Sequence, residues 1–337
     1  MKRNEPRRHH YVAEFHQRGF AEGDERLWLY DRRLQRYRRI HPRNICCEND
    51  LYTIDPNGDR SLHIESNWLS MVDRDGSNAI RRFEDGMQLD EEWKESFSIY
   101  MAQQITRTPV FRDLTIANYR AMGEEFLRLG FSEVDRAKAM MKTYGEGVID
   151  EADGVTAESM VEAVTGGHIQ VGVEEGPFLQ HMVQQVEFLA KWIATFEWEI
   201  IRAPADTGFI LCDFPFVVVP AQARPEDVGF MYPGTVKYFP LTRGLCLRMG
   251  ERDYKFSYSG ASKEDVRIIN QNIAMNSERF IMGPSQGQLE HVIARSGTAT
   301  TDPAPRTVVE AVQSDADSAL YRFNFWPRRS YFYRKIG

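Results

Sequence analysis

The chain has 337 residues, of which 42% are hydrophobic and 12% aromatic, and its formal net charge is −7. A chain of this length buries roughly 75% of its unfolded surface on folding, which excludes an intrinsically disordered or disulfide-dependent class. The sequence has no run of about 20 apolar residues and its basic N-terminus precedes no apolar run, so we expect neither a transmembrane helix nor a secretory signal.

Two short strands are expected near the N-terminus, "LWLYD" at 27–31 and "DLYTI" at 50–54, because both are rich in strand-forming residues. From about 61 to 196, apolar residues recur at intervals of three and four, which predicts helices. Pro109 should end or kink one of these helices, or stand in the first turn of the next. The stretch 145–175 is rich in glycine and acids, and we expect an irregular connection there.

The pattern then changes to strands, in "GFILCDFPFVVVP", "TVKYFPL", "LCLRMG" and "YKFSYSG". A helix follows, with Ser262 as its N-cap and Asp265 three positions on, in a capping-box-like start. The expected fold class is α+β: a helical half (about 61–196) packed with a β-rich half (about 197–283) and an N-terminal strand segment.

Three parts are expected along the chain. Residues 1–291 form a single α+β domain, 292–317 a linker or mobile arm, and 318–337 a basic aromatic C-terminal strand. Such a strand could stack on and neutralise single-stranded nucleic acid, or it could be an amphipathic strand with one solvated face.

Charge is unevenly distributed. Residues 1–43 carry a net +6 and residues 318–337 a net +5, so the part between them carries −18. If the two ends meet, their basic surface could attract a polyanion, because counterion release favours phosphate contacts. Alternatively, the basic ends dock on the acidic middle of the same chain.

Cysteine usage bears on the compartment. The four cysteines, Cys46, Cys47, Cys212 and Cys246, form no CxxC pair. This argues against a zinc ribbon and favours a reducing compartment. We therefore expect a cytoplasmic protein that does not bind membranes, and the oligomeric state stays open.

A series of motifs occurs in a fixed order: "HHYVAEFHQRGF", "LWLYDR", "QITRTPVFR", "CDFPFVV" and "YFPLT". Through this series, over about residues 9–283, the chain resembles the domain of unknown function 4238 family, whose members open on an "HHYVPxFxLRxF"-like motif. Ala13 replaces the family's usual proline and Asp73 its usual glutamate. The resemblance implies candidate positions and little chemistry, together with a bacterial origin and a role as a toxin or defence effector.

Four residues in these motifs are candidate catalytic groups: His9, His10, Arg107 and Asp213. Because alternate residues of a strand face opposite sides, only one of His9 and His10 can enter a site if the segment is a strand. That histidine could act as a general acid or base, or bind a metal. Arg107 could offer a bidentate fork to a phosphate, or could pair with a buried acid such as Asp73 or Asp213.

Asp213 interrupts an apolar strand, so its carboxylate must be exposed, paired or bound to a metal. Four more residues are candidates for binding or orienting a substrate: Arg18, Asp73, Gln104 and Asn270. A divalent metal held by a histidine and carboxylates would suit phosphodiester chemistry, but no diagnostic metal spacing occurs, so cofactor use is left open. Glycine-rich phosphate loops are absent, which excludes P-loop and Rossmann classes.

Two hypotheses for function follow. The first is an intracellular hydrolase or transferase that acts on a phosphate-containing substrate, with nucleic acid or a nucleotide favoured, as in a nuclease. The second is a non-catalytic binding or scaffold protein, in which the same histidine, arginine and aspartate residues form a structural polar network. The first hypothesis requires His10, Arg107 and Asp213 to lie within reach of one substrate.

Overall fold

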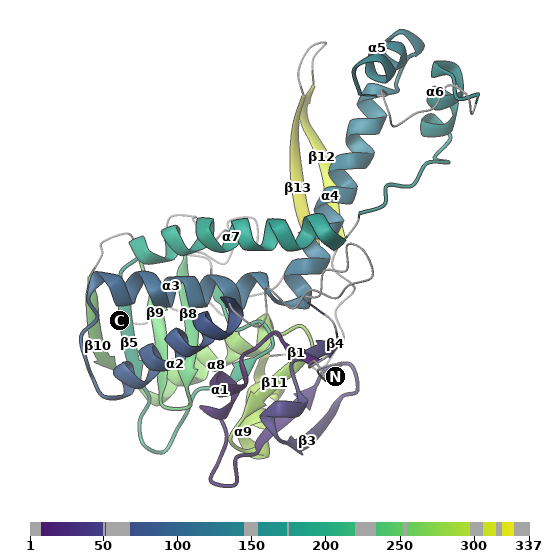
Figure 1. Cartoon of the computed structure of the whole chain (residues 1–337). Helices are drawn as coiled ribbons and strands as arrows, with labels where there is room; N and C mark the ends of the chain where they lie inside the picture. The colour runs from purple at the N-terminus through teal and green to yellow at the C-terminus, as the bar shows by residue number, and fades with distance from the viewer. Residues whose placement is uncertain are drawn as a thin grey trace, which may run out of the picture. The chain divides into compact units, whose positions relative to one another are not determined.

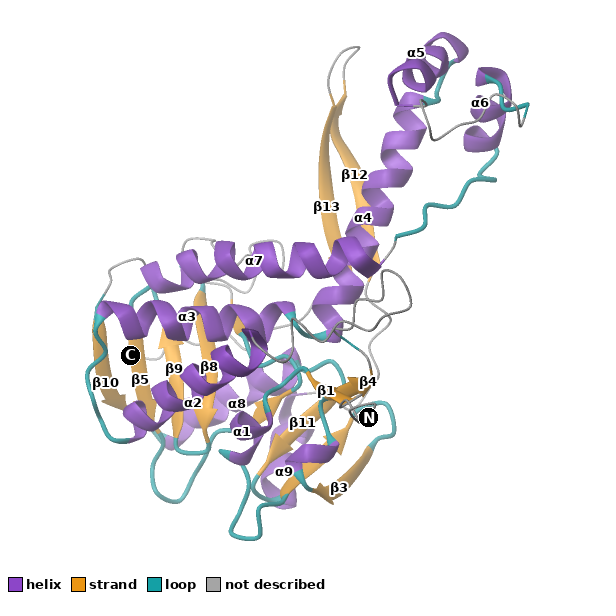
Figure 2. Ribbon diagram, in the orientation of Figure 1, coloured by secondary structure: helices purple, strands orange, loops and turns teal. Residues whose placement is uncertain are grey.

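The fold is α+β, as expected (Figures 1 and 2). The computed structural model describes residues 8–49, 51, 68–144, 154–173, 175–219, 234–251, 255–296, 306–314 and 319–326. The chain forms two compact units, one of residues 1–112, 176–303 and 327–337 and the other of residues 113–175 and 304–326. Among the described residues, no helix is long and apolar enough to cross a membrane.

The first unit contains most of the strands and the helices that cover them. Its helices are α1 (Glu14–Arg18), the 3-10 helix η1 (Pro42–Asn44), α2 (Ser70–Glu84), α3 (Glu91–Thr106), α7 (Glu175–Thr195), α8 (Lys263–Asn276) and α9 (Gln286–Ser296). Its strands are β1 (Arg8–His10), β2 (Leu27–Asp31), β3 (Arg36–Ile40), β4 (Cys47–Asn49), β5 (Trp198–Arg202), β6 (Leu211–Cys212), β7 (Val217–Val219), β8 (Val236–Thr242), β9 (Leu245–Met249), β10 (Phe256–Gly260) and β11 (Phe280–Gly283).

A five-stranded sheet, in the order β10-β5-β9-β8-β7, is covered on both faces. Successive residues of a strand point to opposite faces, so Ile200 packs in the core formed with α2, α3 and α7, whereas Ile201 packs in the core formed with α8. Figure 1 shows α2 and α3 lying along one face of this sheet, with α7 beside α3. Burial on both faces explains why these strands are almost continuously apolar.

A four-stranded sheet, in the order β3-β2-β11-β6, completes the second core. Its β11 pairs antiparallel with both β2 and β6, so Ile281 lies opposite Tyr30 on one side and Cys212 on the other. Because β2 comes from the N-terminus and β11 follows α8, this sheet joins the two ends of the region, about residues 9–283, through which the chain resembles the family.

Several expected elements are confirmed. The strand at 27–31 is β2, a helix begins at Pro109, and the long helix before the strands is α7. At the start of α8, the Ser262 hydroxyl accepts a hydrogen bond from the Asp265 backbone amide, and the Asp265 carboxylate accepts one from the Ser262 amide. The strand expected at 50–54 lies outside the described residues, except for Leu51.

One expectation was wrong. The connection expected at 145–175 contains the helix α6 (Ala157–Thr165), which starts with a capping box made by Thr156 and Ser159. Composition concealed α6, because a helix of nine residues depends on its caps. The linker at 292–317 stays a prediction; its described residues include the end of α9 and the strand β12 (Arg306–Ser314).

The second unit holds α5 (Val134–Tyr144), α6, most of α4 (Pro109–Gly130), and a hairpin of β12 with β13 (Ala319–Trp326). Phe131, Ala137 and Ala157 form its small buried cluster. The hairpin is antiparallel, with a register irregularity between Ala311 and Gln313. The strand expected near the C-terminus is thus present as β13.

Candidate functional site

The histidine pair lies in β1, which pairs antiparallel with β4, so that His9 is opposite Glu48 and His10 is opposite Cys47. The two histidines have different surroundings: His9 is completely buried, whereas His10 is partly exposed. This difference follows from the alternation of side chains along a strand. His10 is therefore the more exposed histidine of the pair.

The His10 ring is held in a neutral form. Burial lowers its pKa below the usual 6.5, the Glu14 carboxylate opposes this shift, and the Arg107 guanidinium adds to it. A hydrogen bond to the backbone of Pro42 orients the ring, and Nε2 is a buried atom with no hydrogen-bond partner among the described residues. A neutral, oriented imidazole is what a general base needs, but a substrate could reach Nε2 only after a local movement exposed it.

Arg107 joins three segments of the chain at the end of α3. Its Nε donates to the Tyr11 carbonyl (2.8 Å), and its Nη1 donates to Asp73 Oδ1 (3.0 Å) and Gln103 Oε1 (3.3 Å). Its side chain is only 1% exposed. The guanidinium therefore fixes the backbone that follows His10 and the carboxylate on α2 at the same time.

Helix α2 can reach Arg107 because it packs very closely on α3. A Cβ atom at Gly76 would lie 2.5 Å from the Tyr100 ring, closer than real contacts allow. Only glycine permits this approach of the two helices. Asp73, one turn before Gly76, is thereby brought to the Arg107 guanidinium.

Asp73 completes a cluster with His10 and Arg107. Burial raises the pKa of Asp73, while the Arg107 charge, its hydrogen bond and the His10 ring lower it. The side chain stays 30% exposed, so the cluster opens to the surface. Residues from β1, α2 and the end of α3 thus lie near one another.

Asp213 has a different role. Its Oδ1 accepts a hydrogen bond from the Glu278 amide (2.9 Å), and its Oδ2 accepts from the amides of Arg279 (2.7 Å) and Phe280 (2.9 Å). Phe280 also accepts from the Asp213 amide (3.1 Å). The side chain is buried, and these bonds hold the start of β11. We therefore assign Asp213 to the scaffold rather than to catalysis, so the site expected from His10, Arg107 and Asp213 together is replaced by one of His10, Arg107 and Asp73.

Arg18 and Asn270, expected to bind or orient a substrate, also lie outside the cluster. Arg18 is on the surface, where it forms ion pairs with Glu14 and Glu25. The Asn270 amide donates to the Gly208 carbonyl (2.9 Å) and accepts from the Ile210 amide (3.0 Å). Arg18 thus stabilises the first helical turn, and Asn270 fixes the connection between β5 and β6.

Gln104, the remaining orienting candidate, is completely buried in α3. Neither its amide nitrogen nor its amide oxygen has a hydrogen-bond partner among the described residues. A buried amide without partners is costly, since each such group loses its hydration. The contacts of Gln104 therefore do not explain why the motif has glutamine here.

Sequence reasoning missed two members of the cluster, Glu14 and Gln103. Glu14 acts on His10 through its charge, and Gln103 accepts a hydrogen bond from Arg107. Gln103 stands four residues before Arg107, a spacing that places both side chains on one helix face and could have identified it. The effect of Glu14 on His10 depends on how α1 follows β1 and has no such signal in the sequence.

His16 is a core residue. Its Nε2 bonds the Pro240 carbonyl (2.6 Å), so it carries the proton, and its Nδ1 accepts from the Tyr100 hydroxyl (3.0 Å). The ring also contacts Phe20 and Phe239. Both ring nitrogens are therefore used to hold α1 on the helical core.

His16 should make the protein sensitive to acid. Burial lowers its pKa to about 4, against 6.5 in the unfolded chain. Below pH 6.5 the His16 ring becomes protonated in the unfolded chain but stays neutral in the folded protein, so the free energy of unfolding falls as the pH drops from 6.5 towards 4. The full loss of unfolding free energy is about 3 kcal/mol. Urea denaturation should show a smaller loss over this range in His16→Gln.

Exposed His291 supplies the control, since His291→Gln should keep the acid sensitivity of the parent protein. An equal fall in stability for His16→Gln and the parent would contradict the assignment.

Among the residues that the structure describes, no group of three or more histidine, cysteine, aspartate or glutamate side chains could hold a metal ion. The cluster of His10, Asp73 and Arg107 contains one cation, one carboxylate and one imidazole. Its chemistry is that of proton transfer beside an ion pair.

The comparisons with known proteins give one match. The family described as "Protein of unknown function (DUF4238)" matches residues 8–287, which include β1, the end of α3, Asp213 and Asn270. No curated protein and no solved structure gave a match. Because the match spans most of the sequence, in the order in which the motifs occur, the chain belongs to the DUF4238 family.

Proposed function

We propose that this protein is a cytoplasmic hydrolase or transferase that acts on a phosphate-containing substrate, a nucleic acid or a nucleotide, with His10 as its acid–base group. The observation that carries the proposal is the His10 ring, oriented and neutral, with a buried Nε2 that no described residue engages, near the Asp73–Arg107 pair. The four cysteines are all free, which agrees with a reducing compartment.

His10 would take a proton from the attacking water or hydroxyl group, and the imidazolium that forms would be stabilised by the nearby carboxylates of Asp73 and Glu14. The positive charges of Arg8 and Arg107 already act on the His10 ring and would also favour a phosphate group there. In this proposal His10 transfers the proton, and the arginines attract the anion.

Arg107 is a positioning residue in this proposal. Its guanidinium is bound to the Tyr11 carbonyl, Asp73 and Gln103 within the protein, so a direct clamp on phosphate fits the geometry less well. By fixing the backbone beside His10, it would keep the ring within hydrogen-bond reach of a substrate.

The second candidate function is a non-catalytic binding or scaffold protein. The same contacts favour it, since Arg107 and Asp213 are bound by groups of the protein itself. In that case the polar network would serve only to join α2, α3 and the N-terminal strand.

The substitution His10→Asn separates the two functions. It should lower the turnover of a phosphodiester substrate about 100-fold or more, because general acid–base catalysis contributes that much. Single-stranded DNA, RNA, nucleotides and a chromogenic phosphodiester are the substrates to test. In the parent enzyme, activity should rise with pH through the lowered pKa of His10 and reach its plateau by neutral pH.

His41→Asn is the matched control, because His41 is a partly exposed histidine in the same region of the chain. It should keep full activity, and both variants should melt at the parent temperature. Equal turnover by His10→Asn and the parent would refute the catalytic role. Binding of nucleic acid without turnover of any of these substrates would favour the scaffold function.

A further inference from the structure

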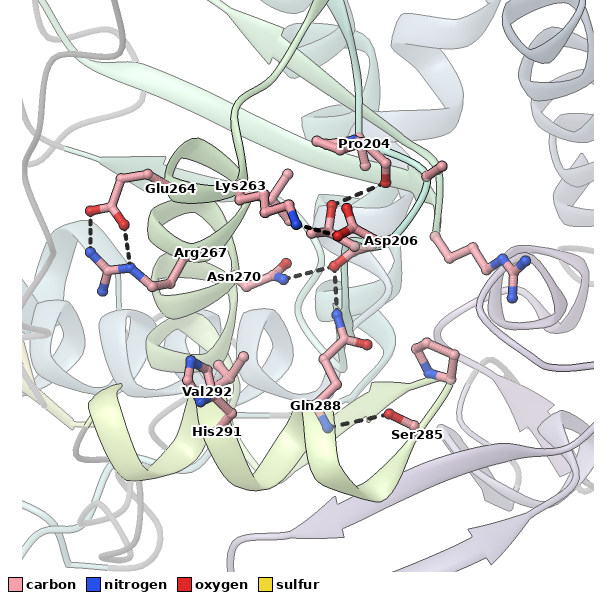
Figure 3. A pocket seen from close by; sticks show the side chains of 18 of the residues that line it. Pro204, Asp206, Lys263, Glu264, Arg267, Asn270, Ser285, Gln288, His291 and Val292 are labelled. Carbon is pink, nitrogen blue, oxygen red and sulfur yellow. Dashed lines mark hydrogen bonds and ion pairs between the residues drawn. The ribbon is translucent and has the colours of Figure 1, made fainter.

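A pocket of about 890 Å³ lies in the first unit, between the connection from β5 to β6, the turn from β8 to β9, and the helices α8 and α9 (Figure 3). None of His10, Asp73 and Arg107 lines it. Its volume is within the range of pockets that bind small molecules. The proposed catalytic function does not account for it.

The floor of the pocket is fixed by two amide side chains. Asn270 from α8 and Gln288 from α9 both donate to the Gly208 carbonyl, at 2.9 and 2.5 Å, and Figure 3 shows the two amides converging there. Asn270 is only 3% exposed. The connection from β5 to β6 is therefore held in one shape before any ligand arrives, which reduces the entropy cost of binding.

Most charges in the pocket are paired. Lys263 forms an ion pair with Asp206, and Arg267 forms one with Glu264. Arg243 is an exposed lining residue for which the structure gives no ion pair among the described residues. The lining also contains Glu22 and His291, both exposed. Arg243 is thus the cation that a ligand could engage without breaking an existing pair.

The start of α9 adds a second attraction for an anion. Ser285 and Pro284 line the pocket just before this helix, and the Ser285 hydroxyl accepts a hydrogen bond from the backbone amide of Gln288 (3.3 Å). The first turn of α9 contains no acidic residue, so its positive dipole end is not neutralised there. Pro204 and Val266 provide apolar surface in the same lining.

We propose that this pocket binds a small organic phosphate of mononucleotide size, with the phosphate group at Arg243 and the start of α9 and the organic body against Pro204 and Val266. Arginine and a helix N-terminus both favour phosphate oxygens. The proposal does not depend on the proposed catalytic function, because the pocket shares no residue with the His10 cluster.

Calorimetric titration of the full chain with AMP tests this site. The parent protein should bind AMP, Arg243→Gln should bind it about tenfold more weakly or worse, and the control Arg295→Gln should bind it like the parent. Arg295 is an exposed residue of α9 that lies outside the pocket lining. Arg243 is exposed, so both variants should keep the melting temperature of the parent.

Two further ligands identify what is recognised. Inorganic phosphate should compete with AMP, and adenosine should bind much more weakly than AMP. The proposal is overturned if AMP does not bind, if Arg243→Gln binds it like the parent, or if adenosine binds as well as AMP. His10→Asn should bind AMP normally, so a failure of the catalytic proposal would be seen separately.

Discussion

Replacing Asp213 with alanine is expected to lower the free energy of unfolding by about 3–5 kcal/mol. The buried carboxylate accepts hydrogen bonds from three successive backbone amides, those of Glu278, Arg279 and Phe280. Without it, the three donors at the start of β11 lose their acceptor in the interior, where little water can replace it. Urea denaturation followed by tryptophan fluorescence would show a large fall in the midpoint.

Asp213→Asn should recover only part of this loss, because one carboxylate oxygen becomes an amide group that itself donates. Asp206→Ala is the control: Asp206 is 61% exposed and pairs with Lys263 at the surface, so its loss should leave the midpoint of urea denaturation almost unchanged. If Asp213→Ala shifts the midpoint of urea denaturation as little as the control does, the carboxylate does not hold β11.

Arg107→Met should destabilise the protein by about 3–5 kcal/mol. The substitution keeps the length of the side chain but leaves the Tyr11 carbonyl, Asp73 and Gln103 without their shared donor. Arg107→Lys should recover little, since a point charge cannot serve three acceptors in a fixed fork. The measurement is again the midpoint and slope of urea denaturation.

Two companion variants locate the effect. Arg39→Met, which breaks an exposed pair with Asp24, should cost under about 1 kcal/mol. In a double-mutant cycle, Arg107→Met and Asp73→Asn should show a coupling of about 1–3 kcal/mol. Additive effects of the two changes would mean that the Arg107–Asp73 pair contributes nothing of its own.

The elements that could be predicted from the sequence are those with strong local patterns. The strand β2 is rich in aliphatic and aromatic residues, and α8 begins with the Ser262 cap three residues before Asp265. The helix α6 was missed because its nine residues depend on the capping box at its start. The strand β12 was not expected because its pairing partner is β13, which a local pattern does not reveal.

The candidate site could be predicted in part. The pairing of Arg107 with Asp73 was foreseen as one of two alternatives, because a buried guanidinium needs an acid. The role of Asp213 could not be foreseen, because its partners are backbone amides 65 to 67 residues away. Side-chain spacing gives no information about backbone donors, so a carboxylate inside an apolar strand suggests catalysis and scaffold equally.

The long-range bonds of the N-terminal segment have a consequence for synthesis on the ribosome. His16 bonds the Pro240 carbonyl, Gly19 accepts a hydrogen bond from the Arg243 amide, and β2 pairs with β11 at residues 280–283. The N-terminal segment therefore cannot reach its folded position until these later residues have been synthesised. The segment that carries His10 would therefore reach its folded position only after residues up to 283 have been synthesised.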